Sequence, residues 1–254
     1  MRETLDRTWR LVATGFGFAV FFGGGCIAAL TILPFVGLSA TAPGQRHRRT
    51  RYLIHRTFQL YLGMLKGLGV LTVTVTDVRK LESLEGQLIV ANHPTLLDVV
   101  LLMAVVPQVQ CIIKHELWNS RYLGGVMRRA GYIRNDMPAE ALIPACKEAL
   151  GAGSNLLIFP EGTRTRPGEP VRFHRGFANI ALLTGAPIQT VSIHCEPLVL
   201  TKGEPWYRIP RRRPHFRVAL GEHLDTPKLL HYQQRPLEAR QLVRRLEAYY
   251  AGLL

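Results

Sequence analysis

Residues 88–98 read LIVANHPTLLD and place a histidine between two apolar segments. The apolar run 88–91 predicts a buried strand, and the apolar run 99–106 predicts a helix. Pro94 suits a first helical position, because it has no N–H to leave unbonded and its φ is already helical. We therefore expect a strand over 88–91, His93 at a helix cap, and a helix from Pro94 to about Val105.

The spacing of His93 and Asp98 limits how their side chains could meet. On a continuous helix, five residues at about 100° each would leave them about 140° apart, too far to pair. They pair only if His93 lies in the loop and its ring folds back over the helix start. A carboxylate bonded to one ring nitrogen fixes the tautomer and leaves the other nitrogen as a base. The alternative for a lone H-x4-D is a capping histidine and a first-turn carboxylate favoured by the helix dipole.

A second polar motif, Phe-Pro-Glu-Gly-Thr-Arg at residues 159–164, follows another strand-like run at residues 155–158. In open α/β sheets, sites form beyond the carboxyl ends of the strands. Gly162 lets a backbone N–H approach an anion, and Arg164 offers a planar fork for phosphate oxygens. The alternative is an ordinary turn with a solvated arginine.

Taken together, the two motifs resemble those of the glycerolipid acyltransferase family, whose best-known members are the 1-acylglycerol-3-phosphate acyltransferases. That family is marked by N-H-x4-D and, some tens of residues later, F-P-E-G-T-R, and both are intact and in order here. The resemblance spans roughly residues 70–220. It implies that His93 acts as a general base with Asp98 as its partner. It assigns binding of the acyl acceptor to Glu161, Gly162, Thr163 and Arg164.

The resemblance extends to three further basic residues. Lys114 ends the strand expected over 109–114 and matches the position that meets the acceptor phosphate; a snorkelling surface lysine is the alternative. Arg134 comes earlier than the family's arginine, and Met137 stands about where that arginine is expected, so we expect Arg134 to substitute for it. Arg175 is expected to be a second anion contact.

The resemblance implies transfer of a fatty acyl chain to the hydroxyl of a lysophospholipid, without a covalent acyl-enzyme. The donor is acyl-CoA or acyl carrier protein as a co-substrate, with no bound cofactor, and no tight cluster of metal ligands is visible in the sequence. The default acceptor is 1-acylglycerol-3-phosphate, giving phosphatidic acid. Because Thr95, Arg134 and Thr190 depart from the family pattern, a specialised acceptor such as a lyso-aminolipid stays open. The alternative to an enzyme is a non-catalytic membrane-binding module with the same fold.

Composition fits one large domain or a domain with an appendage: 254 residues, 47% apolar, with a net charge of +14. The positive charge suits an anionic membrane or anionic substrates. Nucleic-acid binding would need aromatic or groove-reading partners beside the arginines, so we expect none. The scattered cysteines indicate small core residues in a reducing compartment: Cys26, Cys111, Cys146 and Cys195.

The N-terminal region is the candidate membrane segment. Residues 11–45 carry no charge, and the apolar part 11–38 exceeds the ~20 residues that cross a bilayer. A signal peptide and a single span are alternatives. A helical hairpin turning at the glycines or at Pro34 keeps both basic flanks on the cytoplasmic side, and we favour it.

The organisation expected is a membrane-binding helical segment over residues 1–69 and an α/β acyltransferase domain over residues 70–254. The domain should hold a mixed, largely parallel sheet flanked by helices. It should lie on the cytoplasmic face of a membrane, such as a bacterial inner membrane, in contact with anionic lipid. Residues 52–71 predict an amphipathic helix that lies either along the headgroups or against the core. Further elements are expected as strands over 71–76, 187–193 and 216–220, and helices over 121–130, 138–151, 176–185 and 236–250.

Overall fold

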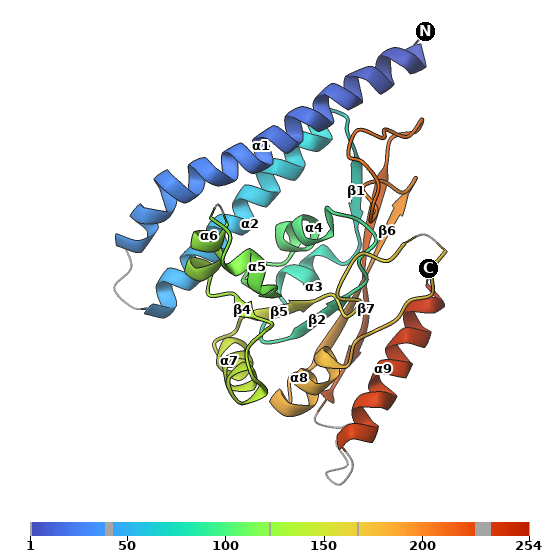
Figure 1. The fold of residues 1–254 in the computed structure, drawn as a ribbon. Coiled ribbons are helices and arrows are strands. Elements are labelled where there is room, and N and C mark those ends of the chain that lie inside the picture. Colours follow the sequence, from blue (N-terminus) through green and yellow to red (C-terminus); the bar gives the residue numbers. More distant parts are fainter. Residues whose placement is uncertain (1, 39–42, 122, 167, 227–234, 254) are drawn as a thin grey trace.

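Seven strands form one sheet in the order β1-β7-β6-β2-β5-β3-β4 (Figure 1). They are β1 Thr72–Val75, β2 Leu88–Ala91, β3 Val109–Ile113, β4 Ile133–Arg134, β5 Asn155–Ile158, β6 Ile188–Glu196 and β7 His215–Leu224. Neighbouring strands run parallel, apart from the antiparallel pair β6 and β7. The prediction of a mixed, largely parallel α/β sheet is confirmed. This computed structural model describes residues 2–38, 43–121, 123–166, 168–226 and 235–253.

Helices cover both faces of this sheet. They are α1 Arg2–Leu38, α2 Pro43–Gly67, α3 Val78–Glu82, α4 Asp98–Val105, α5 His115–Trp118, α6 Gly124–Ala130, α7 Ala139–Gly151, α8 Gly176–Thr184 and α9 Arg235–Ala251. One buried apolar cluster includes residues of α2 and α4, and the other includes residues of α7, α8 and α9. The central strands are therefore packed against helices on both faces of the sheet.

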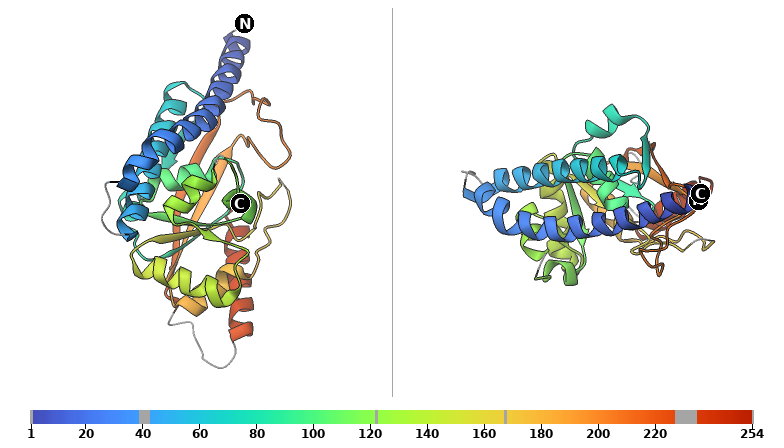
Figure 2. Two further views of the ribbon diagram at one scale, coloured as in Figure 1. Left: turned by 60° about the vertical axis from the view of Figure 1, so that its left-hand side comes forward. Right: turned by 90° about the horizontal axis from the view of Figure 1, so that it is seen from above.

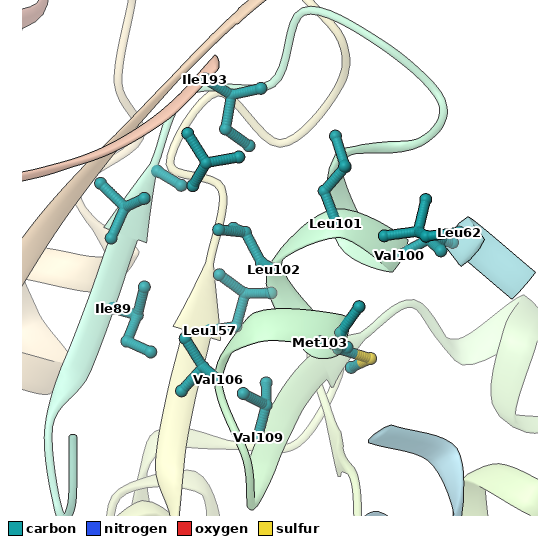
Figure 3. Close-up of a cluster of buried hydrophobic side chains, with 14 of the residues drawn as sticks. Leu62, Ile89, Val100, Leu101, Leu102, Met103, Val106, Val109, Leu157 and Ile193 are labelled. Carbon is teal, nitrogen blue, oxygen red and sulfur yellow. The ribbon is translucent and has the colours of Figure 1, made fainter. Parts of the chain in front are cut away.

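The central strand β2 is buried on both faces, which explains its continuous apolar sequence. Successive side chains of a strand point to opposite faces. Accordingly, Ile89 and Ala91 belong to the α2–α4 cluster, and Leu88 and Val90 to the α7–α9 cluster. Figure 3 shows Ile89 of β2 and Leu157 of β5 beside Leu102 of α4. The two strands that precede the polar motifs are thus parallel neighbours, and their carboxyl ends meet at one edge.

The N-terminal helices differ from the predicted hairpin in where the chain turns. α1 continues through the glycines at 23–25 and through Pro34, so a turn at either place is wrong. Residues 39–42, between α1 and α2, lie outside the described residues. α1 and α2 lie side by side (Figure 2), and a Cβ on Gly17 would come within 2.8 Å of the Leu65 side chain. At Gly17, the missing side chain thus permits close packing of the two helices.

The second helix begins at Pro43, nine residues before the predicted start, and packs against the core. Leu62 and Leu65 are buried in the α2–α4 cluster, and His55 Nδ1 lies 2.8 Å from the Met103 carbonyl oxygen. The sequence left open whether this amphipathic helix lies along the headgroups or against the core. The structure shows that the face with Leu62 and Leu65 packs against the core. Residues 1–69 are therefore attached to the α/β domain through side chains as well as through the chain.

Two arginines counted among the basic flanks are buried instead. Arg10 is 1% exposed and donates to Asp6 and to the carbonyl oxygens of Arg211 and Arg212. Arg51 is 4% exposed and donates to Gln108, Ser154 and the Ala130 carbonyl oxygen. Both guanidinium groups join a helix of the N-terminal pair to the α/β domain.

The helix after His93 begins later than predicted. α4 starts at Asp98, because residues 94–97 form a tight turn in which the Asp98 carboxylate accepts hydrogen bonds from Thr95. His93 lies in the loop before this turn, as the spacing required. Three of the four cysteines are buried, as expected of small core residues: Cys111, Cys146 and Cys195. Cys26 is half-buried.

Replacing Arg51 with alanine should destabilise the fold by about 2–3 kcal/mol, because it leaves the buried Ala130 carbonyl without its donor. The measurement is denaturant unfolding of the detergent-solubilised protein. Arg56→Ala, at an exposed position of the same helix, is the control and should change stability by less than about 0.5 kcal/mol. Equal losses in the two variants would contradict this role of Arg51.

Candidate active site

The imidazole of His93 pairs with the carboxylate of Asp98. Nδ1 of His93 lies 2.8 Å from Oδ2 of Asp98, so the ring folds back over the start of α4. With its proton on Nδ1, the neutral ring donates to the carboxylate and leaves Nε2 as an acceptor. Nε2 has no hydrogen-bond partner among the described residues, and the His93 side chain is 17% exposed. With one ring nitrogen bonded to the carboxylate and the other without a partner in the described part of the protein, the ring has the arrangement of a general base.

Asp98 is held on all sides. It is fully buried, and besides His93 it accepts bonds from the Thr95 N–H at 2.7 Å and the Thr95 hydroxyl at 2.6 Å. Burial raises the pKa of this carboxyl, and the hydrogen bonds from His93 and Thr95 oppose that shift. With three donors pointing at it, the carboxyl group has little rotational freedom and fixes the direction of the imidazole.

The second motif braces the loop that carries His93. Glu161 accepts the His93 backbone N–H at 2.8 Å and, through its other oxygen, the hydroxyl of Thr165. The Thr165 N–H donates to the His93 carbonyl oxygen at 3.2 Å, and the Phe159 ring stacks on the imidazole with centroids 4.3 Å apart. Burial raises the pKa of the Glu161 carboxyl, while its hydrogen bonds oppose the shift. The structure thus shows Glu161 bonded to the loop that carries His93; its role in binding the acyl acceptor stays a prediction.

Gly162 and Arg164 also make contacts within the protein. Gly162 has a positive φ of 68°, and a Cβ there would lie 3.0 Å from the His174 ring, so glycine fits both the backbone and the space. Arg164 Nη1 donates to the carbonyl oxygens of Leu200 and Thr201, at 2.8 and 3.1 Å. Thr163 is exposed beside them. The acceptor roles of these three residues stay predictions, and Arg164 has a structural role as well.

Lys114 and Arg134 end neighbouring strands, since Ile113 of β3 is in register with Arg134 of β4. Lys114 is exposed, whereas Arg134 makes a bidentate pair with Asp136 at 2.6 and 2.9 Å. The hydrogen bond from Arg134 lowers the pKa of Asp136 to about 2. An anion approaching this corner therefore meets one unpaired lysine and one arginine whose charge is already compensated.

Arg175 lies elsewhere, at the start of α8, where it lines a cavity with residues of α9. The structure therefore joins His93, Asp98 and Glu161 into one hydrogen-bonded group and puts Lys114 with Arg134 into a second group. Backbone N–H groups around the two motifs already have acceptors within the protein: those of His93, Thr95, Leu96 and Gly162.

Sequence reasoning missed several residues that position the site. Thr165 follows Glu161 by four residues, just past the motif, and no spacing rule marked it. Asn92 precedes His93 in the motif, and its amide bonds the Ile193 N–H and carbonyl oxygen at 2.7 and 2.8 Å. An asparagine inside an otherwise apolar strand end was the available signal, because a buried amide requires partners.

The fold and the dyad define an α/β protein with the geometry of a general-base site at the carboxyl ends of parallel strands. Residues 72–194 match the family described as Acyltransferase. Over 137 residues the chain is 34% identical to a 1-acyl-sn-glycerol-3-phosphate acyltransferase of Helicobacter pylori, covering 51% of this chain and 55% of that protein. Over 108 residues it is 39% identical to a lyso-ornithine lipid O-acyltransferase of Pseudomonas aeruginosa, covering 41% of each.

A similar solved structure is the crystal structure of the 1-acyl-sn-glycerophosphate (LPA) acyltransferase PlsC from Thermotoga maritima. It has a TM-score of 0.67 and 20% sequence identity, over 98% of both chains, which shows a shared fold. The match to the Acyltransferase family model and the similarity to these relatives support the glycerolipid acyltransferase family that the two motifs predicted. The matched region spans only about a third to just over half of the length of the first curated relatives: 55%, 37% and 36%.

Thr95→Val should destabilise the protein by about 1–3 kcal/mol, because the near-isosteric valine removes the hydroxyl that donates to buried Oδ1 of Asp98. Thr95→Ser keeps that hydroxyl and should cost only about 0.8 kcal/mol for the lost buried methyl group. Denaturant unfolding of the two variants measures the difference. A serine variant as unstable as the valine variant would show that the hydroxyl does not support Asp98.

Proposed function

We propose that the protein is an O-acyltransferase that moves a fatty acyl chain from a thioester to the hydroxyl of a lyso-lipid. The observation that carries this proposal is the His93–Asp98 dyad, 2.8 Å between the bonded atoms, on a partly exposed imidazole whose loop is bonded to Glu161. Family membership gives the reaction class. The donor, either acyl-CoA or acyl carrier protein, and the acceptor are part of the proposal.

In the proposed reaction, Nε2 of His93 takes the acceptor's hydroxyl proton as the oxygen attacks the thioester carbonyl carbon. The tetrahedral intermediate collapses, the carbon–sulfur bond breaks, and the thiolate leaves with the proton from the imidazolium. The Asp98 carboxylate stabilises the imidazolium while it exists. No acyl group is bonded to the protein, because the acceptor oxygen is itself the nucleophile.

The default acceptor is 1-acylglycerol-3-phosphate, which would yield phosphatidic acid. The Helicobacter pylori relative carries that name. Exposed Lys114 offers a charge for the acceptor phosphate beside the end of β3. Its ammonium has no carboxylate partner within the described part of the chain.

A second acceptor class, a lyso-aminolipid, is favoured by the state of the other basic residues. Arg134 is compensated by Asp136, and Arg164 is bonded to two carbonyl oxygens, so neither is a free phosphate ligand in this structure. The Asp136 carboxylate is bonded to Arg134 and lies 3.0 Å from His115 Nδ1, and its remaining lone pairs could accept a further bond from an acceptor ammonium. The Pseudomonas aeruginosa relative is named a lyso-ornithine lipid O-acyltransferase.

The two acceptor classes are separated by supplying labelled acyl donor with a panel of lyso-lipids. Product from 1-acylglycerol-3-phosphate supports the default, and product from lyso-ornithine lipid alone rejects it in favour of the aminolipid. Asp136→Asn should lower kcat/KM selectively for the aminolipid, by about tenfold, since it removes one ionic contact.

His93→Ala should lower the rate of acyl transfer by at least about 10²–10⁴-fold, because it removes the base. Asp98→Asn should cause a loss of similar size through the wrong ring tautomer. The assay is thioester consumption with the preferred acceptor. His223→Ala, an exposed histidine at the opposite end of the sheet from His93, is the control and should retain activity. A folded His93→Ala protein with near-normal turnover would refute the mechanism.

We also propose that residues 1–69 lie on the membrane surface on its cytoplasmic side. Within the described residues, the helical segment Glu3–Ile27 is long and apolar enough to cross a membrane. However, α1 packs along the domain: Phe21 stacks on Phe58, and Phe18 contacts Trp206. A transmembrane placement would bring the domain into the hydrocarbon. The outward side of α1 carries large apolar residues at least 52% exposed, at Leu5, Trp9, Val12, Phe16 and Ile27.

Val12→Asp combined with Phe16→Asp should weaken membrane binding by about tenfold or more, because each apolar side chain loses its lipid contact. Flotation with vesicles of phosphatidylethanolamine and phosphatidylglycerol measures it. Ala141→Asp, on the exposed face of α7, is the matched control for an added charge. Equal flotation of the double variant and the control would reject this docking face.

A further inference from the structure

A cavity of about 310 Å³ lies between the segment that precedes α8 and one side of α9. It is lined by Phe173, Arg175, Arg240, Val243, Arg244 and Glu247, and we call it the arginine pocket. Three guanidinium groups face one carboxylate there. Across the described ranges of the chain, Arg175, Arg240 and Arg244 have no carboxylate within ion-pair distance.

The positive charge of the arginine pocket is not balanced by the protein. Arg240 and Arg244 are four residues apart on α9, so their like charges repel. Arg245, their neighbour, pairs instead with Glu222 at 3.2 Å. The carboxylate of Glu247 is already engaged, because it accepts the Phe173 N–H at 2.7 Å. An anion bound between these arginines would remove the repulsion.

The arginine pocket is connected to the His93 loop through both of its walls. On one wall, the His174 N–H donates to the Pro160 carbonyl oxygen at 2.8 Å, and the His174 ring lies against Gly162. On the other wall, Tyr250 of α9 donates to the carbonyl oxygen of Val90, three residues before His93, at 2.7 Å. Ten helical residues, about 15 Å, separate Tyr250 from Arg240.

We propose that the arginine pocket binds a phosphate group of the acyl donor, an inference that rests on the proposed acyl transfer. The thioester must reach His93, and in both donor types a long pantetheine arm separates that thioester from a phosphate. Planar guanidinium groups are suited to phosphate oxygens. The volume of the arginine pocket is at the lower limit of small-molecule binding sites, and it is large enough for the phosphate-bearing end of the donor. Arg175 is thereby assigned to the donor instead of the acceptor.

The test compares donors that share the thioester and differ in phosphate. Arg240→Gln with Arg244→Gln is assayed with acyl-CoA, with acyl carrier protein, and with acyl-pantetheine, which has no phosphate. KM for a phosphate-bearing donor should rise about tenfold or more, and its advantage over acyl-pantetheine should shrink accordingly. A rise confined to acyl-CoA points to the nucleotide phosphates, and a rise with both acyl-CoA and acyl carrier protein points to the phosphopantetheine phosphate that the two donors share.

Arg245→Gln is the matched control, because this arginine is the next residue on α9 and is already paired with Glu222. Its KM values should stay at those of the unchanged protein. Three results would overturn the proposal: equal KM changes for donors with and without phosphate, a rise in KM for the acceptor alone, or no change with any donor. If the double variant fails to fold, Arg244→Lys replaces it. This variant keeps the positive charge but loses the planar guanidinium, so KM for the phosphate-bearing donors should rise less, and KM for acyl-pantetheine should stay unchanged.

Binding of free CoA, measured by calorimetry, separates this inference from the proposed reaction. The His93→Ala protein should bind CoA like the unchanged protein, and the double variant should bind it about tenfold more weakly. The affinity of the unchanged protein for CoA should fall more steeply with salt concentration than that of the double variant. An unchanged protein that binds CoA but transfers no acyl group would count against the proposed reaction and not against the pocket. If the double variant binds both CoA and acyl carrier protein as tightly as the unchanged protein, the pocket is not a donor site.

Discussion

The buried carboxylate of Asp98 is the constraint around which this end of the molecule is built. A fully buried charge is costly unless it is hydrogen-bonded, and Asp98 obtains three donors from a turn of four residues and one imidazole. Those donors delay the helix until Asp98 and leave His93 in the loop. The same contacts that make the carboxylate tolerable thus orient the base.

The Glu161 turn supplies the second half of that constraint. Glu161 lies in the turn after β5, the strand next to β2. It bonds the backbone of His93, whereas Asp98 bonds the side chain. Arg164 extends the network to the carbonyl oxygens of Leu200 and Thr201, and the Leu96 N–H donates to the same Leu200 oxygen. The two sequence motifs therefore act as one rigid body, and their long separation in the chain is removed by the parallel pairing of their strands.

The sequence was sufficient for the sheet and the dyad because both depend on local patterns. Continuous apolar runs marked the buried strands, and the five-residue spacing required His93 to be in a loop. The start of α4 was misplaced because the proline signal at Pro94 was overruled by the bonds from Thr95 to Asp98. The turn expected in α1 is absent, and its glycines differ in surroundings: Gly17 serves close packing on Leu65, whereas a Cβ on Gly23 or Gly25 would have no neighbour within 4 Å. No local pattern reveals such distant partners.

The charge of +14 illustrates the same limit, because composition counts charges but not their surroundings. Arg10 and Arg51 are buried, and their bonds to backbone carbonyl oxygens and, for Arg51, to neutral side chains fasten the N-terminal helices to the domain. Arg10 is also paired with Asp6. Arg134 is compensated by Asp136. The charge left for anions is distributed over separate surfaces. The pocket beside α9 brings together three arginines that have no carboxylate partner in the described part of the structure. An excess of unpaired guanidinium groups near one cavity is unfavourable for the protein alone, and that cost is the physical reason to look for a ligand there.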